Sequence, residues 1–176
     1  MHHEQSYARA VAVSVFHLNE FSREEFVDKI GPVFEHSPWI AERTFARRHF
    51  QNSQQLHAAL CDTVHAASDD EKLALIRAHP DLVGRAILTA ESTREQASAG
   101  LGELSHEEIS LFENYNREYR ARFGFPFVIC ARLNKKEAIL RAFPTRLQNS
   151  RTQEIETALG EIFKIAELRL ADLVQP

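Results

Sequence analysis

Cysteine, glycine and proline are scarce in this sequence, and their scarcity excludes several classes of protein. The 176 residues include only two cysteines, Cys61 and Cys130, together with six glycines and six prolines. Two cysteines at this separation form neither a disulfide framework nor a C-x-x-C metal pair. Such a composition fits a reducing compartment, and we therefore expect a cytoplasmic protein.

Long apolar runs and clusters of positive charge are missing too. No run approaches the roughly 20 apolar residues that span a bilayer, and the first residues lack the pattern of a signal peptide. Lysine and arginine number 21 against 25 aspartates and glutamates, which gives a net charge of -4. Because there is also no basic block, the sequence predicts neither a nucleic-acid partner nor a membrane partner.

The motifs of common cofactor and metal sites do not occur either. There is no glycine-rich phosphate loop and no H-E-x-x-H pair. The segment His106-Glu107-Glu108 lacks the second histidine, four residues on, that a zinc-binding helix needs. We therefore expect no metal site.

Signals for the start of a helix, by contrast, recur along the chain. Five segments match the capping box, in which a small polar residue precedes a glutamate by three positions, and they begin at Ser22, Ser68, Ser92, Ser105 and Asn134. Apolar residues follow at helical spacing, with helices expected over residues 23–34, 105–123, 134–147 and 152–174, among others. The sequence thus predicts an all-α single domain over residues 1–176, a helical bundle of about eight helices, large enough to bury a core.

Two segments between the expected helices are not helical in pattern. Residues 125–130, Phe-Pro-Phe-Val-Ile-Cys, are the only candidate strand. Pro126 cannot donate to a strand ladder, which favours an extended, unpaired segment instead. Leu82 to Leu88 is interpreted as a short helix or turn.

His79 is the first candidate for chemistry. It precedes Pro80, which pushes the preceding residue out of the helical region, so the helix from Asp69 should end near Ala78. A negative helix end favours the protonated imidazole, and histidine changes charge near pH 7, which suits a general acid/base. The alternative is a histidine that only caps the terminal carbonyl groups.

Glu95, Gln96 and Arg169 are further candidates with two interpretations each. A capping box starting at Ser92 would fully explain Glu95, but it does not explain Gln96. Arg169 lies at the edge of the apolar stripe of the last helix, so it is either solvated or turned into a cavity to hold a carboxylate or ureido group. The extended segment 125–129 either belongs to the core or presents free backbone groups to a planar ligand. Periodicity leaves these alternatives open.

Several short stretches match one known family, in the same order. They are Phe34-Glu-His-Ser-Pro-Trp39, Ala78-His-Pro-Asp-Leu82, Leu88-Thr-Ala-Glu-Ser-Thr-Arg-Glu-Gln-Ala97, Gly100-Leu101, Phe112-x-x-x-Asn116-x-x-Tyr119, Phe123-Gly-Phe-Pro-Phe-Val-Ile-Cys130, Arg146-Leu-x-Asn149 and Ile165-Ala-Glu-Leu-Arg-Leu170. On these stretches the chain resembles 2-oxo-4-hydroxy-4-carboxy-5-ureidoimidazoline (OHCU) decarboxylase, an enzyme of urate breakdown. The resemblance extends from about Phe21 to Val174.

The resemblance implies an all-α fold, a homodimer, no cofactor, and conversion of the small molecule OHCU to (S)-allantoin and carbon dioxide. By position, the family's catalytic residues fall on His79 and Glu95. The substrate-binding positions fall on Pro80, Ser92, Gln96, Phe125, Phe127, Val128, Ile129 and Arg169. The segment between Leu82 and Ser92 is shorter than in the family by one helical turn, about 3.6 residues, which keeps the helix phase nearly unchanged.

A different class of protein shares the tripeptide His79-Pro80-Asp81, which is the hallmark of the co-chaperone J-domain. Such a protein would be a non-catalytic helical binding module. The helix before a J-domain tripeptide should be rich in basic residues, but here it offers only Lys72 and Arg77. A family member without activity is the other alternative to an enzyme.

Overall fold

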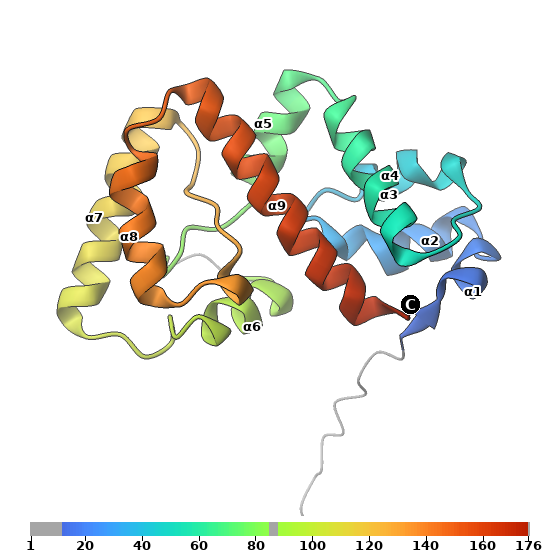
Figure 1. Ribbon diagram of the computed structural model, residues 1–176, viewed down its shortest axis with the longest axis horizontal. Helices are drawn as coiled ribbons and strands as arrows, with labels where there is room; N and C mark the ends of the chain where they lie inside the picture. Colours follow the sequence, from blue (N-terminus) through green and yellow to red (C-terminus); the bar gives the residue numbers. More distant parts are fainter. Residues whose placement is uncertain (1–11, 85–87, 176) are drawn as a thin grey trace, which may run out of the picture.

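One long helix organises the molecule. The structure is a computed structural model that describes residues 12–84 and 88–175. Helix α9 (Arg151–Leu173) runs diagonally across it, with α1 to α4 on one side and α6 to α8 on the other (Figure 1). Helices α2, α4 and α5 pack directly on α9. The all-α prediction is therefore confirmed.

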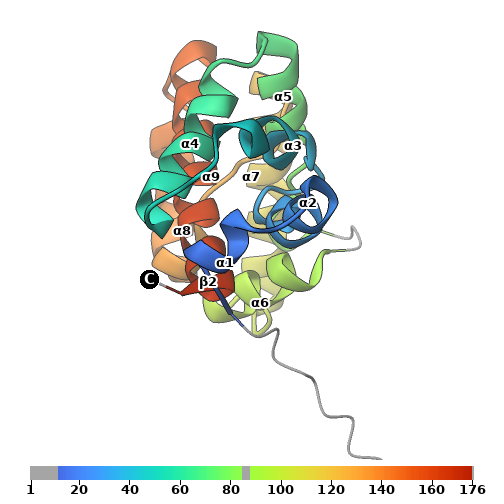
Figure 2. The ribbon, with the colours of Figure 1, turned by 90° about the vertical axis from the view of Figure 1, so that its right-hand side faces the viewer.

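The elements follow the chain in this order. They are β1 (Val13–Ser14), α1 (Val15–Asn19), α2 (Arg23–Ile30), η1 (Gly31–Val33), α3 (Trp39–Thr44), η2 (Phe45–Arg47), α4 (Ser53–His65), α5 (Asp69–Arg77), α6 (Ala90–Ser98), α7 (His106–Phe123), η3 (Ala131–Leu133), α8 (Lys136–Arg146), α9 and β2 (Val174–Gln175). The two short strands pair in parallel, which the sequence did not predict. This pairing lays α1 beside the end of α9 (Figure 2).

Three of the predicted capping boxes are confirmed. At Ser22, Ser68 and Ser105 the serine side chain accepts from the backbone of the glutamate three residues on, and the glutamate side chain accepts from the serine N–H. The last predicted helix is α9, and Gly124 ends α7 in the left-handed conformation, as a C-terminal glycine should.

The box predicted at Ser92 is wrong, and the error concerns the site. Helix α6 begins three residues earlier, because the Thr89 hydroxyl accepts from the backbone N–H of Ser92 at 3.2 Å. Glu95 therefore lies inside the helix and caps nothing. The capping explanation for this carboxylate is removed.

Two other boundaries also differ from the prediction. The box at Asn134 is wrong, since Lys135 precedes α8 without a side-chain cap and the Asn134 amide donates to the Cys130 carbonyl at 3.0 Å. Helix α2 ends at Ile30 instead of residue 34, because Pro32 has no N–H to continue it. The chain then passes through η1 into the turn that holds Glu35.

The core lies along the buried side of α9 and between α7 and α8. Its largest fully buried side chains are Tyr119, Phe26, Phe112, Phe125, Phe127 and Phe143. The predicted extended segment is confirmed: residues 126–130 carry no regular secondary structure. Leu82 and Val83 form a turn, while residues 85–87 of the predicted turn lie outside the described residues. None of the described helices is long and apolar enough to cross a membrane.

Candidate active site

A cavity opens where α5, α6, the extended segment and α9 meet. It contains about 370 Å³ of empty space, part of it continuous with solvent. Its wall consists of His79, Pro80, Leu82, Ser92, Glu95, Gln96, Phe127, Val128, Ile129, Ala131, Ile165 and Arg169.

The end of α5 fixes the imidazole of His79. Pro80 has no N–H, and the His79 N–H turns to the Ile76 carbonyl at 3.2 Å, so the Leu75 carbonyl has no backbone partner from the next turn. The Nδ1 atom of His79 lies 2.9 Å from that carbonyl oxygen. Since a carbonyl only accepts, Nδ1 carries the proton and donates it. In the neutral ring, Nε2 is then the basic nitrogen.

The two interpretations of His79 concern different nitrogens, and only the capping interpretation is observed directly, while Nε2 stays available for the predicted acid/base role. Nδ1 caps the helix end, and the side chain also lines the cavity. The residue is buried, with 6% of its surface exposed. Burial lowers the pKa of His79 to about 4, and the hydrogen bond to Leu75 and the charge of Glu35 oppose this shift only in part. The helix end does favour the charged form, through the hydrogen bond to the Leu75 carbonyl, but desolvation outweighs this effect and the net shift of the pKa is downward.

Side chains from α6 and α7 hold the turn that follows His79. The Asp81 carboxylate accepts from Nε of Arg120 at 2.9 and 3.0 Å. The Asn116 amide donates to the Leu82 carbonyl at 2.7 Å. Val83 has a φ of 57°, a strained value for a β-branched residue, and its N–H donates to Oε1 of Gln96 at 3.2 Å. Because this oxygen is used, the Gln96 NH2 group remains as the donor for a ligand.

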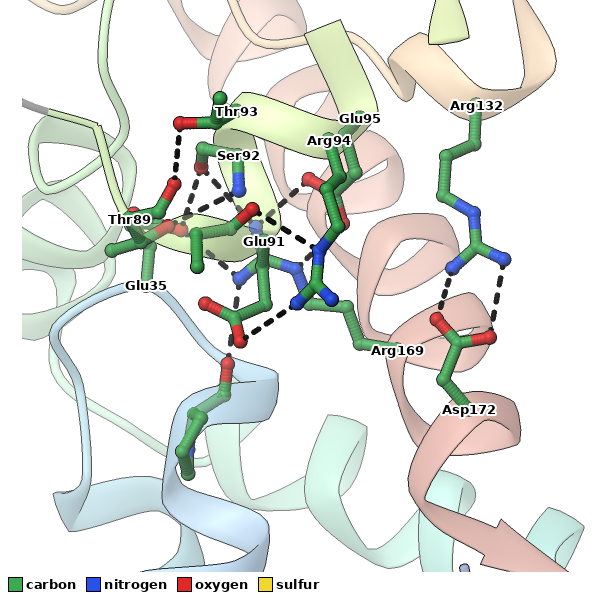
Figure 3. Close-up of polar contacts among 12 residues, drawn as sticks. Glu35, Thr89, Glu91, Ser92, Thr93, Arg94, Glu95, Arg132, Arg169 and Asp172 are labelled. Atoms are coloured by element: carbon green, nitrogen blue, oxygen red, sulfur yellow. Dashed lines mark hydrogen bonds and ion pairs between the residues drawn. The ribbon is translucent and has the colours of Figure 1, made fainter. Parts of the chain in front are cut away.

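Arg169 is the centre of a buried ionic cluster (Figure 3). Its Nε and Nη2 atoms donate to the two oxygens of Glu95 at 2.8 and 2.9 Å. Nη2 also donates to Ser92 at 3.3 Å, and Nη1 donates to Glu35 at 3.0 Å and to the Pro32 carbonyl at 3.4 Å. A guanidinium has five N–H groups, so each of them has a protein acceptor. Arg169 is thus buried, with 4% exposed, and not solvated.

Glu35 is a site residue that the sequence did not single out. Its carboxylate is buried and accepts from Arg169 and from the Ser92 hydroxyl, the latter at 3.1 Å. Burial alone would raise the pKa of Glu35, but the charge of Arg169 and hydrogen bonds from Thr89 and Arg169 outweigh it and lower the pKa. The only signal in the sequence was its place within the stretch Phe34–Trp39 that carried the resemblance.

The extended segment forms one wall of the cavity. Phe127, Val128 and Ile129 line it. The Val128 carbonyl is occupied, since Nη1 of Arg146 donates to it at 2.6 Å. In contrast, none of the hydrogen bonds between described residues uses the N–H group of these three residues. The segment therefore has backbone N–H groups, beside the cavity, that the described residues leave unused.

Comparison with known proteins relates this geometry to a family. The model of the family described as OHCU decarboxylase matches residues 19–171. The chain belongs to the OHCU decarboxylase family. OHCU decarboxylases from Halalkalicoccus jeotgali and Haloferax volcanii are 42% and 43% identical to it over 164 and 155 residues. These matches cover 93% and 88% of this chain and 93% and 92% of the relatives.

Solved structures agree with the family assignment. A crystal structure of (S)-allantoin synthase superposes with a TM-score of 0.76 at 31% identity, over 93% of this chain and 54% of that chain. A crystal structure of OHCU decarboxylase in the presence of (S)-allantoin gives a TM-score of 0.68 at 25% identity, over 87% and 98%. The His-Pro-Asp tripeptide of this OHCU decarboxylase family member is therefore not that of a J-domain.

The structure brings together most of the site positions predicted for an OHCU decarboxylase. Nine of them line the cavity: His79, Pro80, Ser92, Glu95, Gln96, Phe127, Val128, Ile129 and Arg169. The tenth, Phe125, does not; it is fully buried and packs on Phe123 and Tyr119. The shortened segment before Ser92 does not prevent α6 from reaching the cavity.

Proposed function

We propose that this cavity converts OHCU to (S)-allantoin and carbon dioxide, with Nε2 of His79 as the atom that accepts and returns a proton. One observation carries the assignment of that atom: the Nδ1 proton is committed to the Leu75 carbonyl, so only Nε2 can serve a ligand in the cavity. The lowered pKa keeps this nitrogen unprotonated at neutral pH.

The chemistry of OHCU requires little beyond positioning and proton transfer. The carbon that loses carboxylate bears a hydroxyl group and neighbours a ring C=N bond. When the C–C bond to the carboxylate breaks, its electron pair forms a C=C bond and the C=N pair moves to nitrogen, which is protonated. Loss of the hydroxyl proton then gives the carbonyl, while a proton is delivered to the neighbouring carbon. In sum, the substrate anion takes up one proton and releases carbon dioxide.

Each wall of the cavity has a part in this scheme. His79 takes the hydroxyl proton, and positioned acid/base groups of this kind contribute typically about 10²–10⁴-fold. The Gln96 NH2 group and the N–H groups of residues 127–129 are donors for the ring carbonyl or carboxylate. Glu95 is the acceptor for ring or ureido N–H groups, and Arg169 fixes it through two parallel hydrogen bonds.

Glu95→Gln should lower kcat/KM by about tenfold or more. The amide keeps the size of the side chain but presents a donor where Arg169 and the substrate both need an acceptor. Steady-state kinetics with OHCU measures the effect, and exposed Glu107→Gln on α7 is the control. Since Glu95 caps nothing, wild-type activity in Glu95→Gln would remove it from the site.

The function itself is tested by incubating purified protein with freshly generated OHCU. We expect the absorbance of OHCU to decay faster than in buffer, carbon dioxide to be released in equal amount, and optical rotation to appear. Decay at the buffer rate would instead support an inactive helical family member.

Two further features belong to the same proposal. A homodimer is supported by the family resemblance, and light scattering of the purified protein would test it by giving twice the monomer mass of 20.1 kDa.

A cytoplasmic location is supported by the two free thiols, Cys61 and Cys130, which persist in a reducing compartment. Fractionation of the source cells would test the location.

A further inference from the structure

Glu35 gives the site a charge that the anchoring of Arg169 does not require. One guanidinium faces two carboxylates, Glu35 and Glu95, at 3.0 and 2.8 Å. With His79 neutral, these groups sum to one negative charge. Removing a carboxylate from water costs several kcal/mol per ion, and the two bidentate bonds to Glu95 already orient the guanidinium.

Glu35 does not reach the substrate cavity. Among the described residues it lines a second hollow, which opens to solvent, whereas Arg169 lines both. Its oxygen Oε2 accepts from Arg169 and from Ser92, both of which do line the cavity. Any effect of Glu35 on the reaction therefore passes through these two residues or through its charge.

The charge of Glu35 acts on His79. The charged groups that influence the imidazole are Glu35, which favours its protonated form, and Arg169 and His36, which oppose it. When His79 takes a proton from the substrate, a positive charge forms in a buried site. With Glu35 present the cluster and the imidazolium sum to zero, and without it they sum to one positive charge. A fixed, preorganised charge of this kind stabilises the charge that develops during a reaction.

We propose that Glu35 is a positioning residue of the decarboxylase site: it holds Arg169 and Ser92 in place and supplies the negative charge that balances the imidazolium of His79 during proton transfer. The inference rests on the proposed function. It adds a residue from the turn after η1 to a site otherwise formed by α5, α6, α9 and the extended segment.

Two variants separate the charge of Glu35 from its shape. Glu35→Gln keeps the length of the side chain and an oxygen that accepts from Arg169 and Ser92, but it loses the charge. Glu35→Asp keeps the charge but shortens the reach. Exposed Glu42→Gln on the neighbouring helix α3 is the control for removing one carboxylate.

We expect Glu35→Gln to lower kcat by about tenfold, the effect of one pKa unit on a proton-transfer equilibrium. The KM for the anionic substrate should stay the same or fall, because a negative charge near the site has been removed. Glu35→Asp should retain more kcat than Glu35→Gln, and the acid limb of the kcat profile should move to lower pH in Glu35→Gln only.

A merely structural role makes the opposite prediction, since Gln preserves the packing and Asp does not. The proposal is overturned if Glu35→Gln has the kcat of the Glu42→Gln control, or if Glu35→Asp is the slower variant. The proposal would also be overturned if Glu35→Gln were insoluble while Glu35→Asp were soluble and active. Glu35 would then be needed for folding and not for the reaction. Wild-type protein without turnover would overturn the proposed function instead, so the two failures are distinguishable.

Discussion

Replacing His79 by asparagine should lower kcat by about 10²–10⁴-fold and leave the protein folded. In the wild-type protein Nδ1 of His79 lies 2.9 Å from the Leu75 carbonyl oxygen. The amide nitrogen of asparagine takes a position close to that of Nδ1, so it can still donate to this carbonyl. The variant has no counterpart of Nε2. It thus removes the proposed base while keeping the cap at the end of α5.

His79→Ala is the matched comparison, because it removes both nitrogens. We expect similar activity in the two variants and a lower Tm in His79→Ala alone, since a lost helix-end hydrogen bond costs about 1 kcal/mol. OHCU kinetics and thermal denaturation supply both measurements. More than about a tenth of wild-type kcat in His79→Asn would show that His79 is only a capping residue.

Arg169→Met should destabilise the protein and abolish most of its activity. Methionine approximates the length of the side chain but leaves two buried carboxylates, Glu35 and Glu95, without their shared cation. Removing one partner of a buried ion pair costs about 3–5 kcal/mol. In a chain of this size each kcal/mol lowers Tm by about 2–4 °C, so Tm should fall by roughly 6–20 °C.

Arg169→Lys should have an intermediate effect, because an ammonium has three donors where the guanidinium uses five. Exposed Arg141 on α8 provides the control. Arg151, at the start of α9, would be a poor control, because its Nε donates to the Phe123 carbonyl at 3.1 Å. Equal Tm and kcat/KM values in Arg169→Lys and Arg141→Lys would contradict the assigned role of Arg169.

The sequence predicted the helices well wherever a helix start is a local event. The boxes at Ser22, Ser68 and Ser105 need only four consecutive residues, and each formed as expected. At Ser92 two local signals competed, and Thr89, whose hydroxyl can also cap a helix, prevailed three residues earlier. The local pattern did not show which residue would cap the helix. That choice depends on the hydrogen bonds that Ser92 and Glu95 make to Glu35 and Arg169, which lie on other elements.

The site was predictable only in part for the same reason. The His-Pro dipeptide placed His79 at a helix end, and the family resemblance supplied the other positions. The burial of Arg169 followed from neither, since its partners are 134 and 74 residues away in sequence. Glu35 lacked any periodic signal, and its importance arises from the turn that brings it to α9.

Nitrogen-15 NMR of the His79 ring during a pH titration tests the central claim most directly. The account predicts a neutral ring at pH 7 with the proton on Nδ1, and protonation only near pH 4, below the ordinary value of 6.5. Because the unfolded chain would bind this proton at a higher pH, the contribution of His79 to stability should be complete above pH 6.5 and lost as the pH falls to about 4. Protonation near pH 6.5 would contradict the desolvation of the ring, and a neutral ring with the proton on Nε2 would contradict the assignment of Nε2 as the catalytic base.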